Sequence, residues 1–586
     1  MSTLTITEIR WKRAILELVF TEDEPNDDTL YLYRTKEKRF IPFTTINEGD
    51  HKVARVNITI AGERKVLSRG QWIIARKIDD ALLTDLDTLL AAKPHLLARI
   101  EHDVRRHHKA ARRNEEVLAE YVQSEGLSYV QANPYDTYGI NYLPSILEEI
   151  DQYSRFFRYA KDTYVYTVSM KVRESSEKHL YVFLDVEFYM RNPNPDVRKK
   201  SKRFTEKRIM SAYFNLLKRV TKRDGKQILF FKNNADGPTE NMQALQTRIT
   251  ERGLDQEFRV VNRYHNIFKG KQKLGKWLKD LSLIAKSDYI FIDDYAPIFN
   301  FIELDDDVVL TQLWHAGVGF KSVGYARFGL KGSPDPNASC HRHYTYALIG
   351  NEHLRDIYSE VFGIEPEALL ATGMPRLDHF LEPQTAEAAR TDLYERYPEL
   401  EGHRVILFAP TFRGTGQRTA YYPYDLVDIP ALHELCLETD SYFIFEMHHF
   451  IRKRPPIEPE YQDRVLDLTD ESLNELFHIA DVLITDYSSC FYDYLLLKRP
   501  VVLYVPDKVA YTATRGVQRP IDEMAPGEVC ESFDELLDTL RTRHYEEVEP
   551  KALTIDRAAE GGMLASDRAI DTILLGKDVP GVRMKG

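Results

Sequence analysis

From residue 226 onward, short apolar runs recur at regular distances, and this rhythm constrains the fold more than any other feature. The runs include "QILFFKN", "YIFIDDY" and "VVLTQLWHA", and beyond a charged joint at 381–403 they resume with "VILFAPT", "YFIFEMH", "DVLITD" and "PVVLYVP". Strands of a buried parallel sheet appear in a sequence as such short apolar runs, and the stretches between these runs are compatible with helices. The pattern predicts two doubly wound α/β domains, 226–385 and 386–586, with the ligand site in the cleft between them at the carboxyl ends of strands.

The first 225 residues follow other patterns. Residues 1–195 alternate apolar and polar positions in short runs, which predicts a β-rich accessory domain, and a charged stretch of helical period within it predicts a helical insertion. Residues 196–225 are predicted to form a basic amphipathic linker helix. Between 191 and 226 there are thirteen Lys or Arg against three acids.

Apolar residues are interleaved with this basic charge. They are Ile209, Met210, Tyr213, Phe214, Leu216 and Leu217. A shared apolar face beneath positive charge is typical of a helix lying on an anionic membrane surface. The alternative is a solvated interdomain helix that packs on its own protein, and the sequence leaves both open.

Composition narrows the class of protein. Hydrophobic residues make up 43% of the 586 residues and charged residues 29%, as in a folded globular chain. The net charge of −12 argues against a generally basic nucleic-acid binder, so no nucleic-acid partner is expected. The four cysteines are far apart, which predicts neither disulfides nor a zinc site and fits a reducing cytoplasm. We find neither a signal peptide nor an apolar run long enough to span a bilayer.

Two adjacent serines follow the predicted strand "DVLIT". Thr485 ends that strand, and Asp486, Ser488 and Ser489 stand where the chain turns into a helix beginning near Cys490. The first N–H groups of a helix lack internal partners, and two hydroxyls add donors, so this turn predicts a phosphate site. The alternative is that one serine only caps the helix.

Two arginines also follow strands. "ILFAPTFRG" places Thr411 and Arg413 after one strand, and "LLATGMPRLDHF" places Arg376 and Asp378 after another. A guanidinium fork suits a phosphate, although a single arginine in this position is often part of a surface ion pair. We interpret these side chains as projecting into the same cleft.

Histidines supply the candidate bases. His315 follows "VVLTQLW" and precedes Gly317, which permits a sharp turn and close approach of a substrate. His448 follows "YFIFEM". A histidine at the carboxyl end of a strand titrates near neutral pH and can take a proton from a hydroxyl nucleophile. A hydrogen-bonded structural histidine remains the alternative for each.

Acidic and basic clusters elsewhere are interpreted as solvated. Asp293-Asp294 follows "YIFI", Asp305 to Asp307 precede a strand, and His341 to His343 lie in a loop with Pro and Asn. We expect turns exposed to solvent at these positions and no metal site. The chain also lacks a Walker loop and a G-x-G-x-x-G motif, which disfavours ATP or dinucleotide binding of those kinds.

Taken together, these stretches resemble the CDP-glycerol glycerophosphotransferase family of teichoic acid and capsule polymerases and primases. The matching elements are "LWHAG", "TGMPRLD", "FAPTFR", "EMHH", "ADVLITDYSS", "LLLKRPVVLYVPD" followed by Arg515-Gly516, and the closing "EGGMLASDRAIDTIL". Each element alone is a weak signal of the family, but the order and spacing of all of them make the resemblance specific. The resemblance covers about 226 to 575.

The resemblance implies a GT-B architecture and a cytoplasmic enzyme at the inner face of the membrane. An acceptor hydroxyl on a polymer or lipid would attack the β-phosphorus of CDP-glycerol or CDP-ribitol and release CMP, without a tightly bound cofactor. His315 would be the general base, and the pyrophosphate would be held and neutralised by His448, Thr411, Arg413, Thr485, Ser488 and Ser489.

This sequence also departs from the family pattern. Glu446 stands where a basic residue is usual, His449 where proline is, and Ala316 with Val318 replaces the usual Gly and Pro. The choice of acceptor and of glycerol or ribitol therefore stays open. A glycosyltransferase using a nucleotide sugar and an impaired scaffold of a surface-polymer assembly are the alternatives.

Overall fold

The computed structural model divides the chain into two compact units. One unit is residues 1–192 with 328–331, and the other is 193–327 with 332–586. The residues that the structure describes are 4–23, 30–34, 39–49, 51–61, 64–77, 135–136, 139–159, 164–174, 178–190, 197–233, 236–265, 274–315, 322–329, 333–337, 339–414, 417–514, 516–517, 519–560 and 562–582.

The first unit contains two sheets. A five-stranded sheet has the order β5-β6-β2-β1-β9, and a second sheet has the order β10-β11-β12-β7-β3-β4 with β8 paired to β7. The strands are β1 (Leu4–Lys12), β2 (Ile15–Glu22), β3 (Leu30–Arg34), β4 (Arg39–Pro42), β5 (Thr44–Glu48), β6 (His51–Asn57), β7 (Gly70–Lys77), β8 (Tyr135–Asp136), β9 (Ile140–Tyr142), β10 (Arg155–Tyr159), β11 (Tyr164–Glu174) and β12 (Leu180–Met190). All the pairings are antiparallel except β1 with β9. The helical insertion predicted in this region falls largely on 78–134, outside the described residues.

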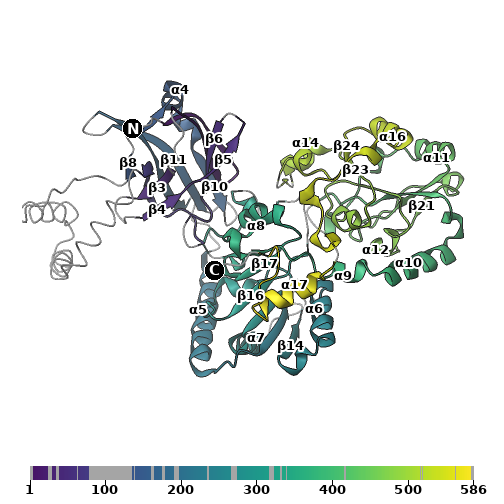
Figure 1. The fold of residues 1–586 in the computed structure, drawn as a ribbon, viewed down its shortest axis with the longest axis horizontal. Helices are drawn as coiled ribbons and strands as arrows, with labels where there is room; N and C mark the ends of the chain where they lie inside the picture. Colours follow the sequence, from purple (N-terminus) through teal and green to yellow (C-terminus); the bar gives the residue numbers. More distant parts are fainter. Residues whose placement is uncertain are drawn as a thin grey trace, which may run out of the picture. The chain divides into compact units, whose positions relative to one another are not determined.

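The second unit holds two parallel six-stranded sheets, which we call the first and second lobes (Figure 1). The first-lobe sheet has the order β14-β13-β15-β16-β17-β18. Its strands are β13 (Gln227–Lys232), β14 (Arg259–Tyr264), β15 (Tyr289–Ile292), β16 (Val309–Gln312), β17 (Tyr346–Leu348) and β18 (Leu369–Leu370), with helices α6 (Glu240–Glu251), α7 (Leu274–Lys286) and α8 (Arg355–Phe362) between them. Every pairing in this sheet is parallel, as the apolar runs predict.

The second lobe has the strand order β21-β20-β19-β22-β23-β24, again with parallel pairings throughout. Its strands are β19 (Arg404–Phe408), β20 (Ser441–Phe445), β21 (Val465–Asp467), β22 (Val482–Thr485), β23 (Val501–Tyr504) and β24 (Glu528–Cys530). Its helices include α10 (Pro383–Arg396), α11 (Ile429–Glu438), α12 (Leu473–Leu476), α13 (Phe491–Tyr494), α14 (Lys508–Thr514) and α16 (Phe533–Thr542). In this order the sheet has its topological switch point between β19 and β22, where ligands bind in doubly wound folds.

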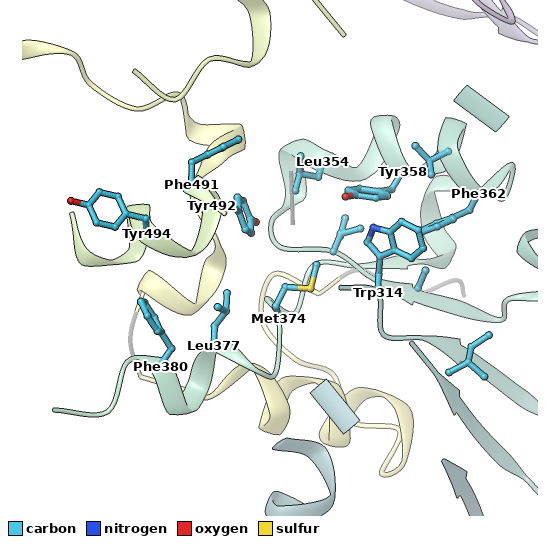
Figure 2. Packing of buried hydrophobic residues seen from close by; sticks show 14 of the residues in the cluster. Trp314, Leu354, Tyr358, Phe362, Met374, Leu377, Phe380, Phe491, Tyr492 and Tyr494 are labelled. Atoms are coloured by element: carbon cyan, nitrogen blue, oxygen red, sulfur yellow. The ribbon is translucent and has the colours of Figure 1, made fainter. Parts of the chain in front are cut away.

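A single apolar cluster joins the two lobes. Phe491, Tyr492 and Tyr494 of the second lobe belong to the same buried cluster as Trp314 and Met374 of the first (Figure 2). Because burial of shared apolar area opposes separation, this packing holds the carboxyl ends of the two sheets in a defined relation.

The chain crosses back to the first lobe at its end. Helix α17 (Ala565–Ile573), expected within the domain 386–586, packs against α6 and shares a core with β13 (Figure 1). Arg248 of α6 and Arg252, which caps the end of α6, bind Asp567 at 2.8 Å, and Arg252 also binds Asp571. The closing helix therefore ties the second lobe's sequence to the first lobe's sheet.

The basic segment 196–225 contains helix α5 (Val197–Val220). Its apolar residues do not share one face, which corrects the sequence interpretation. Met210 and Phe214 are buried in the first lobe's core, whereas Ile209 and Leu216 are 61% and 57% exposed. Part of the apolar set thus packs on its own protein, and part faces solvent. Among the described residues, no helix is both long enough and apolar enough to cross a bilayer.

The loop at His341 to His343 is also not solvated as expected. His341 and Arg342 are each 6% exposed. The Arg342 guanidinium stacks over Tyr325 and donates hydrogen bonds to the carbonyls of Gly363 and Pro336. These residues pack the first lobe and lie away from the site described next.

Candidate active site

Polar side chains gather where the two switch points face each other. In the first lobe the switch lies between β13 and β15, which end at Lys232 and immediately before Asp293. In the second lobe it lies between β19 and β22, and Ser488 follows β22 closely. Ligands of doubly wound sheets bind at such points, so the topology alone selects these residues.

A pocket of about 490 Å³ occupies this place. Both lobes contribute to its lining, which is Lys232, Thr239, Glu240, Asn241, Asp293, Asp294, His315, Arg376, Asn474, Ser488, Ser489, Cys490 and Asp493. Of the residues predicted from the sequence, the structure brings together His315, Arg376 and the two serines. The histidine comes from one lobe and the hydroxyls from the other.

The backbone before His315 is bent in an unusual way. Trp314 has φ of 57°, a left-handed conformation that is rare for a bulky residue. Its N–H donates to the Gln312 side chain at 3.0 Å, and its carbonyl accepts a hydrogen bond from the Asn241 amide at 2.8 Å. Such conformations persist where surrounding contacts enforce them, and they are common at functional sites. Here the bend directs His315 out of the strand line and into the pocket.

His315 lies beside two carboxylates. Its Nδ1 is 3.3 Å from the backbone carbonyl of Asp293 and 3.7 Å from Oδ1 of Asp294. The other carboxylate oxygen of Asp294 is 3.6 Å from Nζ of Lys232. Because a carbonyl oxygen only accepts hydrogen bonds, this geometry favours the proton on Nδ1 and leaves the Nε2 lone pair available.

Asp293 lies beneath this arrangement and is only 1% exposed. Burial raises the pKa of its carboxyl to about 6, and the Asp294 carboxylate adds to the rise, while a hydrogen bond from Thr239 and the charge of His315 oppose it. The amide of Asn241 donates to both Asp293 oxygens at 3.4 Å. The sequence interpretation of Asp293-Asp294 as a solvated turn is therefore wrong, because the pair follows a strand that ends inside the pocket.

The two serines lie in the loop between β22 and α13. The Ser488 hydroxyl accepts a hydrogen bond from the N–H of Cys490 at 3.4 Å, and both serines line the pocket. Helix α13 is a single turn, so its dipole is short and the hydroxyls supply much of the donor capacity. Ser488 thus lines the pocket and makes a contact within the turn, but the N-cap of α13 is Cys490 and no side chain caps that helix, so the helix-cap interpretation is wrong. The phosphate site stays a prediction.

Arg376 reaches the pocket already paired. Its guanidinium makes a bidentate ion pair with the Asp493 carboxylate on α13. The Arg376 side chain is only 13% exposed. The pair joins the lobes across the pocket floor. Asp378, predicted beside it, instead accepts hydrogen bonds from the N–H groups of Ala565 and Ser566 and caps α17.

Arg413 lies below the serine loop rather than in the pocket lining. Its guanidinium pairs with Asp486 at 2.7 Å and with Asp507 at 2.6 Å, and it lies within 5.1–5.6 Å of the ring centres of Tyr422, Tyr487 and Tyr511. The Thr411 N–H donates to Asp486, and the Thr485 hydroxyl donates to the carbonyl of Ala409. These predicted residues form a buried support for the loop that carries Ser488.

The remaining predicted residues do not join the pocket lining. His448 stacks between Phe412 and His449, with ring centres 4.9 Å and 4.4 Å away, and its Nδ1 accepts from the N–H of Phe450. Gly317 and Arg515 lie outside the described residues. Among described residues, no group of three or more His, Cys, Asp or Glu is placed to hold a metal ion.

Sequence reasoning missed several lining residues. Lys232 and the two aspartates follow apolar strands in the same way as His315, so the rule that found the histidine would also have found them. Asn241 and Asn474 stand at the beginnings of helices α6 and α12, where an asparagine carries no signal of its own. Only the approach of the two lobes brings them to the pocket.

The chain has two parallel α/β lobes, and in the pocket at their switch points a histidine beside a carboxylate faces the hydroxyl groups of two serines. These features define a class of two-lobed α/β proteins suited to group transfer. A family model assigns the chain more narrowly. The model for CDP-glycerol:poly(glycerophosphate) glycerophosphotransferase matches residues 213–557, more than half of the chain, and the chain belongs to this family.

Individual relatives agree with this assignment. The teichoic acid ribitol-phosphate polymerase TarK of Staphylococcus aureus (strain NCTC 8325 / PS 47) is 32% identical over 339 residues, which are 58% of this chain and 66% of TarK. The teichoic acid poly(ribitol-phosphate) polymerase of Bacillus spizizenii (strain ATCC 23059 / NRRL B-14472 / W23) is 32% identical over 354 residues, 60% of this chain and 56% of the relative. The chain thus spans less than two thirds of each relative's length.

Among solved structures, a variant of the wall teichoic acid polymerase TagF is similar to this chain. It has a TM-score of 0.46 and 17% identity, and the match covers 66% of this chain and 98% of that structure.

Proposed function

We propose that the chain transfers glycerol phosphate or ribitol phosphate from a CDP-alditol to a hydroxyl of a cell-surface polymer of the teichoic acid or capsule type, and releases CMP. Membership of the family and the curated relatives, which are polyol-phosphate polymerases, support this activity. The observation that carries it is the position of His315, with its Nε2 available, in one pocket with Ser488 and Ser489. We also propose that the two lobes form a GT-B pair.

His315 would act as the general base. The attacking acceptor hydroxyl gives its proton to Nε2 as its oxygen forms a bond to the β-phosphorus, and the bond from that phosphorus to the bridging oxygen breaks, so that CMP leaves with the electron pair. The Asp293 carbonyl and the Asp294 carboxylate would orient the ring and stabilise the imidazolium that forms. These contacts support a positioning role for both aspartates.

Ser488, Ser489 and Lys232 would hold the diphosphate of the donor. Phosphate transfer needs mainly positioning and stabilisation of charge, which hydroxyl donors, N–H groups and an ammonium supply. Arg376 and Arg413, already bound to carboxylates, would act by fixing the pocket floor and the serine loop. His448, Gly317 and Arg515 remain candidates for substrate binding from the sequence alone.

The test is His315→Ala, assayed for CMP release with CDP-glycerol, CDP-ribitol and a panel of UDP-sugars in the presence of acceptor. We expect loss of at least about a hundredfold in kcat with little change in donor affinity, because a general base contributes about 10²–10⁴-fold. His353→Ala, an exposed histidine of the first lobe, is the matched control. Normal turnover by His315→Ala would remove the base from the proposal, and release of UDP alone would favour a glycosyltransferase.

We further propose a cytoplasmic location, with the protein peripheral at the inner face of the membrane. Support comes from α5, where the exposed apolar Ile209, Leu216 and Val220 stand beside basic residues such as Arg208 and Arg219. Ile209→Ser with Leu216→Ser should lower co-sedimentation with vesicles containing anionic lipid. Equal binding by this variant and the parent would count against the membrane contact.

A further inference from the structure

Asn241 is a buried asparagine in the wall of the pocket that holds His315, and its side-chain amide has partners on three chain segments. It is the second residue of α6 and is 1% exposed. Its Nδ2 group donates a hydrogen bond to the carbonyl of Trp314 at 2.8 Å and lies 3.4 Å from both carboxylate oxygens of Asp293. Its Oδ1 accepts a hydrogen bond from the N–H of Arg376 at 3.1 Å. One amide therefore joins two strand ends of the first lobe to the residue that reaches the second lobe.

The partners of Asn241 require an amide at this position. A backbone carbonyl only accepts hydrogen bonds and a backbone N–H only donates them, so the amide nitrogen must face Trp314 and the amide oxygen must face Arg376. An ionised aspartate has no donor for the Trp314 carbonyl, and an apolar side chain pairs with neither group. Because buried polar groups left unpaired are costly, the site calls for a side chain that donates and accepts at once.

The first contact of Asn241 acts on the chain that carries the base. Trp314 has a left-handed backbone with φ of 57°, and such a conformation persists where surrounding contacts enforce it. The Gln312 side chain holds the N–H of Trp314 at 3.0 Å, and Asn241 holds its carbonyl. That carbonyl belongs to the planar peptide group that joins Trp314 to His315. Asn241 thus fixes the direction in which the backbone enters His315.

The second contact of Asn241 leads to the second lobe. The N–H that it binds belongs to Arg376, whose guanidinium pairs with Asp493 of α13. Helix α13 directly follows the loop that carries Ser488 and Ser489. Each link in this series is largely buried, since the side chains of Arg376 and Asp493 are 13% and 10% exposed. Close-packed interiors transmit displacements, so the series ties the position of the base to that of the two hydroxyl groups.

We propose that Asn241 is a positioning residue that sets the direction of His315 relative to the hydroxyl groups of Ser488 and Ser489. The proposal rests on the proposed function and adds a residue to that same site. Asn241 itself exchanges no proton with the substrate and acts through the base. The acceptor oxygen, the base and the phosphorus must be aligned for transfer, and a misplacement of about 1 Å can cost about 10²-fold in rate.

The first test follows the tautomer of His315, which does not depend on turnover. In the wild type, Nδ1 faces the carbonyl of Asp293 at 3.3 Å, so we expect the proton on Nδ1. NMR of isotope-labelled histidine at about pH 8, where a free imidazole is neutral, reports which nitrogen is protonated. The His315 signals are assigned from their absence in His315→Ala. Asn241→Ala and Asn241→Leu should each give a mixture of the two tautomers.

Two variants of Asn241 and a matched control keep this test sharp. Asn241→Ala leaves space in which water can pair with the exposed partners, whereas Asn241→Leu keeps nearly the original volume, and thermal unfolding identifies the folded variants. Asn351 is another buried asparagine of the first lobe, 7% exposed, and its amide donates to the carbonyls of Leu553 and Ile555 at 3.0 and 2.7 Å. Asn351→Ala removes comparable contacts away from the base and should keep the wild-type tautomer.

The second test measures turnover of the CDP-alditol in the presence of acceptor. We expect Asn241→Ala to lower kcat by at least about tenfold and to leave KM for the donor within about twofold, because alignment and not donor binding is lost. Combining Asn241→Ala with His315→Ala should lower kcat by less than about twofold beyond His315→Ala alone. A residue that acts through the base has no further effect once the base is absent.

The outcomes separate this proposal from the proposed function. A changed His315 tautomer in a folded Asn241 variant supports the positioning role even if the wild type turns over no donor, in which case the proposed function alone fails. An unchanged tautomer overturns the role, whether or not the protein is active. Losses that multiply fully in the double variant, or a raised donor KM at unchanged kcat, would also overturn it, because Asn241 would then stabilise the fold or bind the donor.

Discussion

Replacing Asp293 by Asn tests whether the pocket floor carries a carboxyl kept partly neutral by burial. The substitution is isosteric and removes the ionisation while keeping the side chain's size. In the folded chain the pKa of this carboxyl is raised from 3.8 to about 6. A raised carboxyl pKa stabilises the folded state at low pH, and this contribution is complete below the unfolded pKa of 3.8. It is lost as the pH rises through 6, because between these two values the folded chain holds a proton that the unfolded chain has released.

The size of the effect follows from the two pKa values. The difference is 6 − 3.8, or 2.2 pH units, and each unit corresponds to about 1.36 kcal/mol, so the ionised Asp293 costs about 3 kcal/mol of unfolding free energy above pH 7. Asp293→Asn avoids this cost. Relative to wild type, the variant should therefore gain about 2–3 kcal/mol between pH 4 and pH 7, while losing activity because the contacts around His315 change.

Calorimetric unfolding at several pH values measures the difference. The transition of the two-lobed unit is followed, because a chain with two compact units has no single unfolding free energy. For a unit of this size the gain corresponds to roughly 3 to 6 °C in Tm at pH 7 relative to pH 4. Asp294→Asn, which changes a carboxylate that is 29% exposed, controls for the altered pocket charge. A Tm difference between Asp293→Asn and wild type that stays constant from pH 4 to pH 7 would refute the reasoning.

Three further predictions concern the contacts between the lobes and the proposed donor site. Asp493→Asn leaves the Arg376 guanidinium buried without its partner and should lower the unfolding free energy by about 3–5 kcal/mol. The double variant Asp493→Leu with Arg376→Met should restore most of that free energy, because it removes both charges. A loss below about 1 kcal/mol in Asp493→Asn would contradict the prediction. Ser488→Ala should weaken CDP-alditol binding about tenfold or more, because a hydrogen bond to a charged group contributes about 1.5–3 kcal/mol. Titration calorimetry measures the affinity, and an unchanged value would place the diphosphate elsewhere. Gly350→Ala would put a Cβ 1.6 Å from the Tyr492 hydroxyl, so it should lower the unfolding free energy by about 1–3 kcal/mol. If adding Tyr492→Phe recovered none of that loss, the clash would not be its cause.

The parallel sheets could be predicted because their strands are buried on both faces and therefore read as continuous apolar runs. The rule that ligands bind at the carboxyl ends of such strands then led to His315, Ser488 and Ser489, and the structure brings these three into one pocket. The same rule would also have selected Asp293, which follows β15, but a local interpretation took it for a turn in solvent. Burial depends on what packs above the strand end, and that information is not local.

The arginines show a second limit. Arg413 and Arg376 were predicted as phosphate ligands from their positions after strands, yet each is held by carboxylates distant in the sequence, Asp486 and Asp507 for one and Asp493 for the other. A guanidinium binds whichever anion the fold brings within reach. Ion pairing over such separations is set by packing, so no local pattern indicates that these charges are already neutralised.

By itself, the sequence determined the two parallel sheets, the polar residues at their strand ends and the family to which the chain belongs, because strand periodicity and motif order are properties of neighbouring residues. The tertiary structure decided which strand ends meet. It set the left-handed bend at Trp314 that aims His315, and it divided the apolar residues of α5 between core and solvent. It also enclosed a cavity of about 860 Å³ between α6 of the first lobe and α10 and α12 of the second. These features depend on contacts between residues far apart in the chain, and no local pattern encodes them.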